Sequence, residues 1–227
     1  MKPINFCPRA VIFDMDGLLI NSEHVWEVVE GDMLIARGVQ LNQAIRAQFI
    51  GMRMGDFWRG MHDSFHLAEP VEDLIAEAMQ GMVERVGTEA EPQPGALALI
   101  DFVVARRIPC AIASSSPMPI IDAVVGAHGW GEVFALRVCG NDVQHGKPAP
   151  DIYLETARRL GVPPEACLAL EDSVNGARAA VAAGMTTIAV PDAAHTTAEA
   201  FRGVTDYVVP TLHEVRAALE DCDFAAV

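Results

Sequence analysis

Short apolar runs alternate with helical segments along most of this chain. Each run is nearly continuous in apolar or β-branched residues, which is typical of parallel strands that are covered on both faces. The runs occupy residues 10–13, 109–113, 136–139, 167–170, 186–190 and 207–209. Helical patterns occupy residues 117–128, 150–160, 174–183 and 212–219. The alternation predicts an α/β fold, namely a doubly wound, mostly parallel Rossmann-like sheet with right-handed crossovers.

Residues 22–87 interrupt this alternation, because they show helical periodicity and no convincing strand. Valine, leucine and methionine recur there at helical spacing, which indicates helix packing rather than a cofactor pocket. We therefore expect a small all-helical cap inserted after the first strand. The stretch 87–95 contains two prolines and has the chemistry of a linker that returns the chain to the sheet. The expected division is 1–20 and 88–227 for the α/β catalytic core, and 21–87 for the helical cap.

The charge balance argues against two classes of partner. The chain of 227 residues has 16 basic and 31 acidic side chains, a formal net charge of −15. A negative field of this size repels nucleic acid and anionic membrane surfaces, so we expect neither as a partner.

The 5 cysteines of the chain do not have the spacing of a zinc site. Because we find no targeting segment and no run of about 18 apolar residues, we expect a cytoplasmic protein, as a monomer or a weak dimer.

A first pair of acids, Asp14 and Asp16, follows the apolar run at residues 10–13. In an extended chain, residues i and i+2 point the same way, so both carboxylates can face one crevice. Open α/β sheets bind their ligands at this carboxyl edge. Asp16-Gly17 is also an ordinary turn pair, but a turn does not explain the additional acid at the strand tip.

A second pair, Glu171 and Asp172, closes the run at residues 167–170. Carboxylates that meet at neighbouring strand ends repel one another unless a hard cation lies between them, and Mg²⁺ prefers such sites. The local alternative is that Asp172 or Ser173 caps the helix that follows.

Two further features suit a phosphate site. Ser114, Ser115 and Ser116 follow a predicted strand and precede Pro117, and hydroxyl and backbone N–H groups at a helix start bind anions. Lys147 lies in a loop that is stiffened by two prolines, Pro148 and Pro150. Alone, the serines are a plain helix cap and the lysine is a solvated side chain, so the argument depends on their combination with the acids.

In this order, the motifs resemble those of the haloacid dehalogenase-like superfamily of phosphohydrolases. They are Asp14-Met15-Asp16-Gly17, Ser114, Lys147 in Gly-Lys-Pro-Ala-Pro, and Glu171-Asp172. Phe-Asp-Met-Asp-Gly-Leu-Leu-Ile-Asn-Ser-Glu and Leu-Glu-Asp-Ser-Val-Asn-Gly are most similar to the sugar-phosphatase and β-phosphoglucomutase branch. Asp16 argues against carbon–halogen chemistry, since dehalogenating members generally lack an acid there. Asn21 stands where Asp is often seen.

The resemblance implies a role for each motif residue. Asp14 would attack phosphorus and form an aspartyl-phosphate. Asp16 would protonate the leaving alcohol and then take a proton from the hydrolytic water. Ser114 would hold a phosphoryl oxygen with Ser115 binding substrate beside it, and Lys147 would offset the charge of the nucleophile and the phosphate.

The resemblance also implies a Mg²⁺ cofactor. Its ligands would be the carboxylates of Asp14 and Asp172 and the backbone carbonyl of Asp16. Glu171 would orient a water on the metal without touching the metal itself.

The cap is expected to choose the substrate. In this branch, a loop spaced like residues 51–56 reaches into the cleft, which implies that Gly51 and Arg53 bind substrate. The alternative interpretation is that Arg53 is a surface-exposed arginine at the start of a helix. Trp26 and Met54 stand where the mutases of the branch carry a histidine and an arginine. Trp26 would instead offer an aromatic wall to a sugar ring.

These features predict a Mg²⁺-dependent phosphatase that acts on small phosphorylated metabolites, above all sugar phosphates. A phosphomutase is the alternative within enzymes. A non-catalytic binding module on the same fold is a second alternative, against which Asp14, Asp16, Lys147 and Asp172 together argue.

Overall fold

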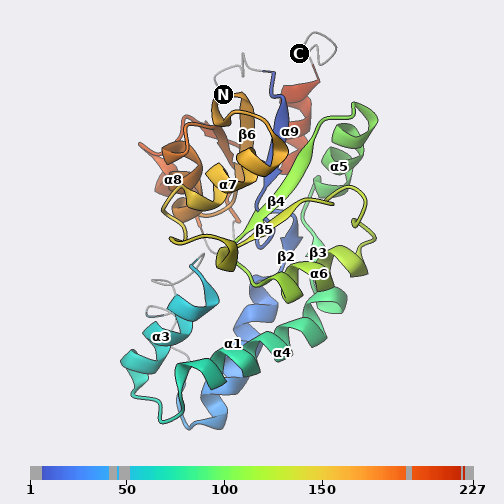
Figure 1. Cartoon of the computed structure of the whole chain (residues 1–227). Helices are drawn as coiled ribbons and strands as arrows, with labels where there is room; N and C mark the ends of the chain where they lie inside the picture. Colours follow the sequence, from blue (N-terminus) through green and yellow to red (C-terminus); the bar gives the residue numbers. More distant parts are fainter. Residues whose placement is uncertain (1–6, 41–44, 46–51, 193–195, 221, 223–227) are drawn as a thin grey trace.

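The computed structural model describes residues 7–40, 45, 52–192, 196–220 and 222. Within them, a sheet of six parallel strands has the order β5-β4-β1-β6-β7-β8 (Figure 1). The strands are β1 (Ala10–Phe13), β4 (Cys110–Ser114), β5 (Arg137–Cys139), β6 (Cys167–Glu171), β7 (Thr186–Ala189) and β8 (Tyr207–Val208). Each overlaps one of the apolar runs, and the parallel sheet confirms the predicted doubly wound α/β fold.

Helices cover both faces of this sheet. They are α5 (Ala96–Ala105), α6 (Met118–Ala127), α7 (Asp151–Leu160), α8 (Val174–Ala182) and α9 (Leu212–Leu219). Side chains along β1 alternate between the two faces. Ala10 and Ile12 pack in one core with residues of α7 and α8. Val11 and Phe13 pack in the other core with residues of α5, α6 and α9, which explains why the strand is apolar throughout.

The connections contain short 3-10 helices. In the described chain these are η1 (Gly140–Asp142), η2 (Pro164–Ala166) and η3 (Ala198–Phe201). None of the described helices is both long enough and apolar enough to cross a membrane.

The segment after β1 is helical, as the sequence predicts. In its described part, α1 (Glu23–Ala36), α3 (Met54–Phe65) and α4 (Val71–Glu89) lie together below the sheet in Figure 1. Gly81 of α4 faces Val29 of α1, where an added Cβ would lie 3.1 Å from the valine Cγ1, so the two helices approach closely. These helices are the ones we assign to the cap; its boundaries at residues 21 and 87 stay a prediction.

Two features of this region are absent from the sequence prediction. The chain enters and leaves the cap through an antiparallel pair, β2 (Ile20–Asn21) and β3 (Glu91–Pro92). These strands are too short to produce a recognisable apolar pattern. In addition, α4 continues through Gly87, so the connection back to the core is shorter than the predicted linker at 87–95.

Helix α5 was also not predicted. It lies between Gly95 and the turn before β4, and all but one of its residues are apolar. Such a segment has no polar face, so it lacks the period of 3.6 residues that distinguishes a helix from a buried strand.

We expect the replacement of Phe134 by alanine to destabilise the core strongly. Phe134 is fully buried, and its ring meets Phe13 edge-on with centroids 5.4 Å apart. Removing the ring leaves a cavity beside the central strand, which costs about 3–5 kcal/mol. Urea unfolding measures this loss. Leu97→Ala is the matched control: Leu97 is 53% exposed on α5, and its variant should unfold within about 0.5 kcal/mol of the unmodified protein.

Candidate active site

The carboxyl ends of β1 and β6 bring the two acidic pairs together. Phe13 lies opposite Leu170 in the parallel ladder, so the acids that follow each strand emerge side by side. The Asp14 amide donates to the carbonyl of Leu170 at 3.0 Å. Carboxylate oxygens of Asp14, Glu171 and Asp172 lie within 4.8 Å of one another, and all three residues are buried.

Gly17 allows the chain after β1 to pass next to Asp172. Its φ is +79°, a left-handed conformation that favours glycine, and a Cβ added there would overlap the Asp172 carboxylate. The Gly17 amide donates to the carbonyl of Ile20 at 2.9 Å, and the Gly17 carbonyl accepts a hydrogen bond from Gln93 Nε2 at 3.0 Å. Asp16-Gly17 therefore forms a turn, as its residue types predict, and this turn lies next to the acidic cluster.

Lys147 joins the cluster as its positive charge. Its Nζ donates to Asp14 Oδ1 at 2.6 Å, to Glu171 Oε1 at 2.5 Å and to the carbonyl of Ala113 at 3.1 Å. Burial by itself would lower the pKa of Lys147, but the charges of Asp14 and Glu171 outweigh it and raise the pKa above its usual range. Lys147 therefore stays protonated, and all its N–H groups have acceptors.

Glu171 is fixed from several sides. Tyr153 donates its hydroxyl to Glu171 Oε1 at 2.6 Å, and Ser173 Oγ donates to Oε2 at 3.1 Å. A Cβ at Gly176 would overlap the Glu171 carboxylate, so the first turn of α8 leaves it room. Ser173 itself caps α8 by accepting from the Gly176 amide at 3.1 Å. The N-terminal cap of helix α8 is therefore the Ser173 side chain and not the Asp172 carboxylate.

The electrostatics of the cluster suit a cation. Burial raises the pKa of Asp14 well above its usual value, with Lys147 opposing this shift and the charges of Glu171 and Asp16 adding to it. Burial likewise raises the pKa of Asp172, and the charges of Asp14, Glu171 and Glu23 raise it further. Among the described residues of the cluster, the single charge of Lys147 does not offset the three carboxylates of Asp14, Glu171 and Asp172. Hard carboxylate oxygens in close proximity are the donors that Mg²⁺ prefers, so the residues present fit this ion.

Asp16 lies apart from the cluster and accepts hydrogen bonds at both oxygens. Its Oδ1 accepts from Ser22 Oγ at 2.8 Å and from Trp26 Nε1 at 3.2 Å. Its Oδ2 accepts from Ser114 Oγ at 3.1 Å and from Ser116 Oγ at 2.8 Å. Donors at the start of α1, on α1 itself, at the end of β4 and in the loop after β4 therefore fix this carboxylate between core and cap.

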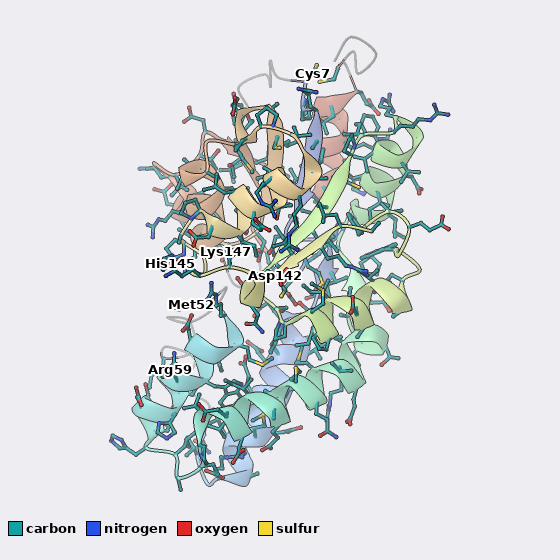
Figure 2. The ribbon with its side chains drawn as sticks, in the orientation of Figure 1. Cys7, Met52, Arg59, Asp142, His145 and Lys147 are labelled. Atoms are coloured by element: carbon teal, nitrogen blue, oxygen red, sulfur yellow. The ribbon has the colours of Figure 1, made fainter. Side chains whose placement is uncertain are left out.

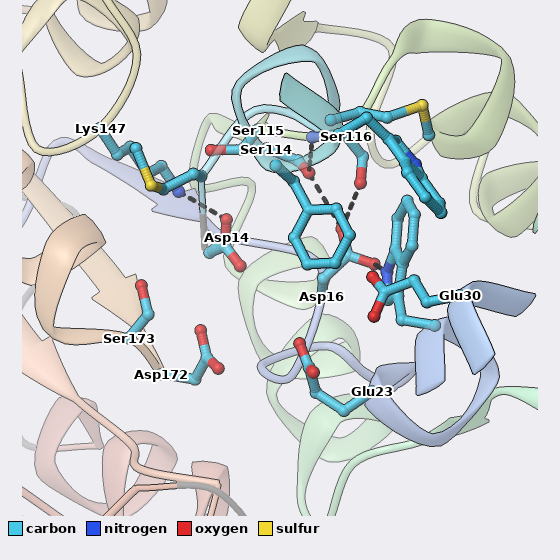
Figure 3. Close-up of a pocket in the computed structure, with 15 residues that line it drawn as sticks. Asp14, Asp16, Glu23, Glu30, Ser114, Ser115, Ser116, Lys147, Asp172 and Ser173 are labelled. Carbon is cyan, nitrogen blue, oxygen red and sulfur yellow. Dashed lines mark hydrogen bonds and ion pairs between the residues drawn. The ribbon is translucent and has the colours of Figure 1, made fainter. Parts of the chain in front are cut away.

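One pocket contains most of the predicted residues. Figure 3 shows Lys147 directed at Asp14, Asp172 and Ser173 to one side, and Asp16 beside the serines. The lining residues are Asp14, Asp16, Glu23, Trp26, Glu30, Met52, Met54, Phe57, Trp58, Ser114, Ser115, Ser116, Lys147, Asp172 and Ser173. Core residues thus supply the aspartates, serines and lysine of the pocket, and α1 supplies Trp26 and two glutamates. The remaining aromatic and methionine side chains come from α3 and from Met52, which precedes it.

The predicted cap contacts have different outcomes. Gly51 lies outside the described residues. Arg53 is not among the residues that line the pocket; its Nη atoms donate to the carbonyls of Val143 and Gln144 at 2.9 Å and 3.1 Å. In Figure 2, Lys147 lies on the side of the core that faces Met52 of the cap. Arg53 therefore links the cap to the loop that carries Lys147, and its role in substrate binding stays a prediction.

Several residues of the site are given no individual role by the sequence. Ser22 and Ser116 each lie inside a motif that the sequence does identify, Asn-Ser-Glu and the triple serine. Tyr153 gave no signal, since a tyrosine in an amphipathic helix is usually packing. Glu30 and Trp58 likewise needed the packing of the cap to be identified.

The family model described as "Hydrolase: haloacid dehalogenase-like hydrolase" matches residues 8–184. The chain is 35% identical over 189 residues to a "Probable pseudouridine-5'-phosphatase" of Drosophila melanogaster, with 80% of each chain covered. It is also 35% identical over 189 residues to "Hexitol phosphatase B" of Escherichia coli K12, which covers 80% of this chain and 83% of the relative.

The fold is similar to that of solved structures. The crystal structure of CbbY from Rhodobacter sphaeroides in complex with phosphate superposes with a TM-score of 0.82 and 28% sequence identity. The match covers 94% of this chain and 99% of that one. It therefore includes both the sheet and the helices that we assign to the cap.

We expect Gly17→Ala to weaken Mg²⁺ binding, because the new Cβ displaces the Asp172 carboxylate. Gly184→Ala is the matched control: Gly184 has a similar φ of +83°, but no atom lies within 4 Å of an added Cβ. Both variants carry a backbone strain of about 1–2 kcal/mol, and only Gly17→Ala should lose Mg²⁺ affinity, by about 10–100-fold. The Mg²⁺ dependence of the melting temperature measures this difference. An equal loss in both variants would refute the contact.

We expect Arg53→Met to loosen the link between cap and core. The loss of two hydrogen bonds from a charged donor should lower the unfolding free energy by about 1–3 kcal/mol. If Arg53 acts only as this link, kcat/KM falls by the same factor for substrates with uncharged and anionic leaving groups. A loss confined to the anionic substrates would instead identify Arg53 as a substrate-binding residue.

Proposed function

Because the chain belongs to the haloacid dehalogenase-like hydrolases, we propose that it is a Mg²⁺-dependent phosphatase of small phosphorylated metabolites, in particular sugar phosphates, and that it forms an aspartyl-phosphate. The observation that carries the proposal is the convergence of Asp14, Lys147 and Asp172 in one buried cluster. Asp16 lies in the same pocket.

In the first step, Asp14 is the nucleophile. A carboxylate oxygen of Asp14 forms a bond to phosphorus as the bond from phosphorus to the leaving oxygen breaks. Lys147 is already hydrogen-bonded to Asp14, so it holds the carboxylate in one orientation and neutralises part of its charge. Two anions would otherwise have to approach each other inside a buried site.

Asp16 is the acid–base residue of the proposal. It would transfer a proton to the leaving oxygen, and later accept one from the water that attacks the aspartyl-phosphate. Its hydrogen bonds to Trp26 and Ser22 keep the carboxylate at the boundary between the phosphate and the cap side of the pocket. Ser114 and Ser116 donate to the same carboxylate, so they are in position to turn toward phosphoryl oxygens when substrate enters.

Asp14, Asp172 and the backbone carbonyl of Asp16 are the proposed Mg²⁺ ligands, with Glu171 behind them. When bound, Mg²⁺ would offset the charge of the phosphate and of the acids around it. Glu171 is engaged by Lys147 and Tyr153, which agrees with a supporting role rather than direct ligation.

The site supports a phosphatase over a phosphomutase. A mutase must hold a second phosphate, which requires another cation near the leaving group. Among the described lining residues, Lys147 is the only lysine or arginine, and Arg53 is directed at two backbone carbonyls. Trp26 and Met54, at the positions compared with the mutase histidine and arginine, both line the pocket. Bisphosphate-dependent isomerisation of glucose 1-phosphate faster than phosphate release would contradict this assignment.

We expect Asp14→Asn to lower Mg²⁺-dependent phosphate release by more than about 10³-fold, because the amide is not a nucleophile. The assay measures phosphate release from a panel of metabolite monoesters, with Mg²⁺ and with chelator. Asp101→Asn, on an exposed position of α5, is the control and should keep full activity. Turnover by Asp14→Asn with unchanged Mg²⁺ dependence would refute the covalent mechanism, and absence of phosphate release from every monoester would refute the phosphatase proposal.

A further inference from the structure

Tyr153 carries a hydroxyl that the packing of its helix does not require. It lies in the first turn of α7, is 0% exposed and belongs to the same apolar core as Ile12 of β1 and Ala169 of β6. A phenylalanine ring would fill this apolar space equally well. A buried hydroxyl is unfavourable unless it has a hydrogen-bond partner. Packing therefore explains the ring of Tyr153 but not its hydroxyl.

That hydroxyl donates to the same carboxylate oxygen as the lysine of the site. The Tyr153 hydroxyl donates to Glu171 Oε1 at 2.6 Å, and Lys147 Nζ donates to this oxygen at 2.5 Å. The Lys147 ammonium group also lies 5.2 Å from the centre of the Tyr153 ring, within the range of a cation–π contact. Because the loop that carries Lys147 leads directly into α7, one short segment of the chain supplies both donors.

Glu171 has a donor at each of its acceptor positions. Its Oε2 accepts from the Ser173 amide at 3.3 Å and from Ser173 Oγ at 3.1 Å. A carboxylate has about four acceptor positions, and Lys147, Tyr153 and the two groups of Ser173 occupy that many. If the Tyr153 hydroxyl were removed, Lys147 would be the one remaining donor to Oε1 among the residues that the structure describes.

Two carboxylates share the single positive charge of Lys147. Its Nζ lies 2.6 Å from Asp14 Oδ1 and 2.5 Å from Glu171 Oε1, and Figure 3 shows the side chain directed at Asp14. An ammonium group that moves closer to one acid neutralises less of the charge of the other. The proposed mechanism needs this positive charge at Asp14 and at the phosphate. A neutral donor that stabilises Glu171 therefore leaves more of the ammonium charge to Asp14.

We infer that Tyr153 is a positioning residue: its hydroxyl stabilises the Glu171 carboxylate and thereby keeps the Lys147 ammonium group placed for Asp14 instead of drawn toward Glu171. Tyr153 is not among the residues that line the pocket, so it acts through Glu171 and Lys147 and not on the substrate. The effect on turnover rests on the proposed phosphatase function. The placement of the ammonium group does not, and it is measured without substrate.

Tyr153→Phe keeps the ring and removes the hydroxyl. For the phosphomonoester that the unmodified protein hydrolyses with the highest kcat/KM, we expect kcat to fall about tenfold, an effect typical of groups that support an active-site side chain. KM should change by less than about twofold, because no contact to the substrate is lost. A kcat equal to that of the unmodified protein would overturn the inference.

Thr156→Val is the matched control. Thr156 is on the same helix, is 0% exposed, and donates its hydroxyl to the carbonyl of Ile152 at 2.7 Å. Both variants lose one buried hydrogen bond, so both should melt at a lower temperature than the unmodified protein. Only Tyr153→Phe should lose kcat. An equal loss of kcat in both variants would assign the effect to general destabilisation of α7 and overturn the inference.

The ammonium group of Lys147 can be followed by magnetic resonance in protein without substrate. The chain has two lysines, Lys2 and Lys147, so isotope labelling of the lysine side-chain nitrogen gives at most one signal from each. Lys2→Arg leaves the signal of Lys147 alone and so assigns it. We expect Tyr153→Phe to shift this signal and Thr156→Val to leave it in place. An unshifted signal in Tyr153→Phe would overturn the inference.

The two measurements separate the inference from the proposed function. Phosphate release by the unmodified protein with an unchanged kcat in Tyr153→Phe would overturn the inference alone. A shifted Lys147 signal without phosphate release from any monoester would overturn the proposed function and support the placement of Lys147 by Tyr153. If Tyr153→Phe does not fold, fluorotyrosine incorporated into Tyr207→Phe protein makes Tyr153 a stronger donor, and an unshifted Lys147 signal would then overturn the inference.

Discussion

A protonated lysine held between two buried carboxylates organises this active site. The hydrogen bonds of Lys147 to Asp14, Glu171 and the carbonyl of Ala113 join the loop after η1 to three adjacent strands, β1, β4 and β6. Removing one partner from such a buried ion pair typically costs about 3–5 kcal/mol, because a charge is left without compensation. The cluster therefore requires the sheet order that is observed, and the sheet in turn fixes Asp14, the proposed nucleophile.

Asp16 lies in different surroundings from Asp14 although only Met15 separates them. Met15 is fully buried, and the turn at Gly17 directs the chain toward the cap. Asp14 consequently faces the lysine and the acids, whereas Asp16 receives hydrogen bonds from serines of the core and from Trp26 of the cap. The two aspartates thus line one pocket in different surroundings: Asp14 faces Lys147, and Asp16 faces the serines and Trp26.

Most of the sheet could be predicted because a strand buried on both faces has to be apolar along its length, as Ala10–Phe13 is. The same property prevented the prediction of α5. Its sequence is apolar on all sides, so it does not show the helical period of polar and apolar residues. The motif residues could be placed at strand ends, since parallel strands bring those ends to one edge. Arg53, Glu30 and Trp58 could not be placed, because their surroundings depend on how helices distant in sequence pack against the core. The periodicity of a sequence identifies which face of a helix is buried, but not which residues of other elements pack against that face.

The pairing of β2 with β3 brings the two covalent connections of the cap to one place. The chain enters the cap at Ile20–Asn21 and leaves it at Glu91–Pro92, and these two strands lie side by side. The segment between them therefore begins and ends at neighbouring positions. A different helical segment with the same short end-to-end distance could replace the cap without changing the register of the central sheet. The central sheet and the helical segment between β2 and β3 are in this sense separate modules of the chain, and protein engineering could exchange one while keeping the other.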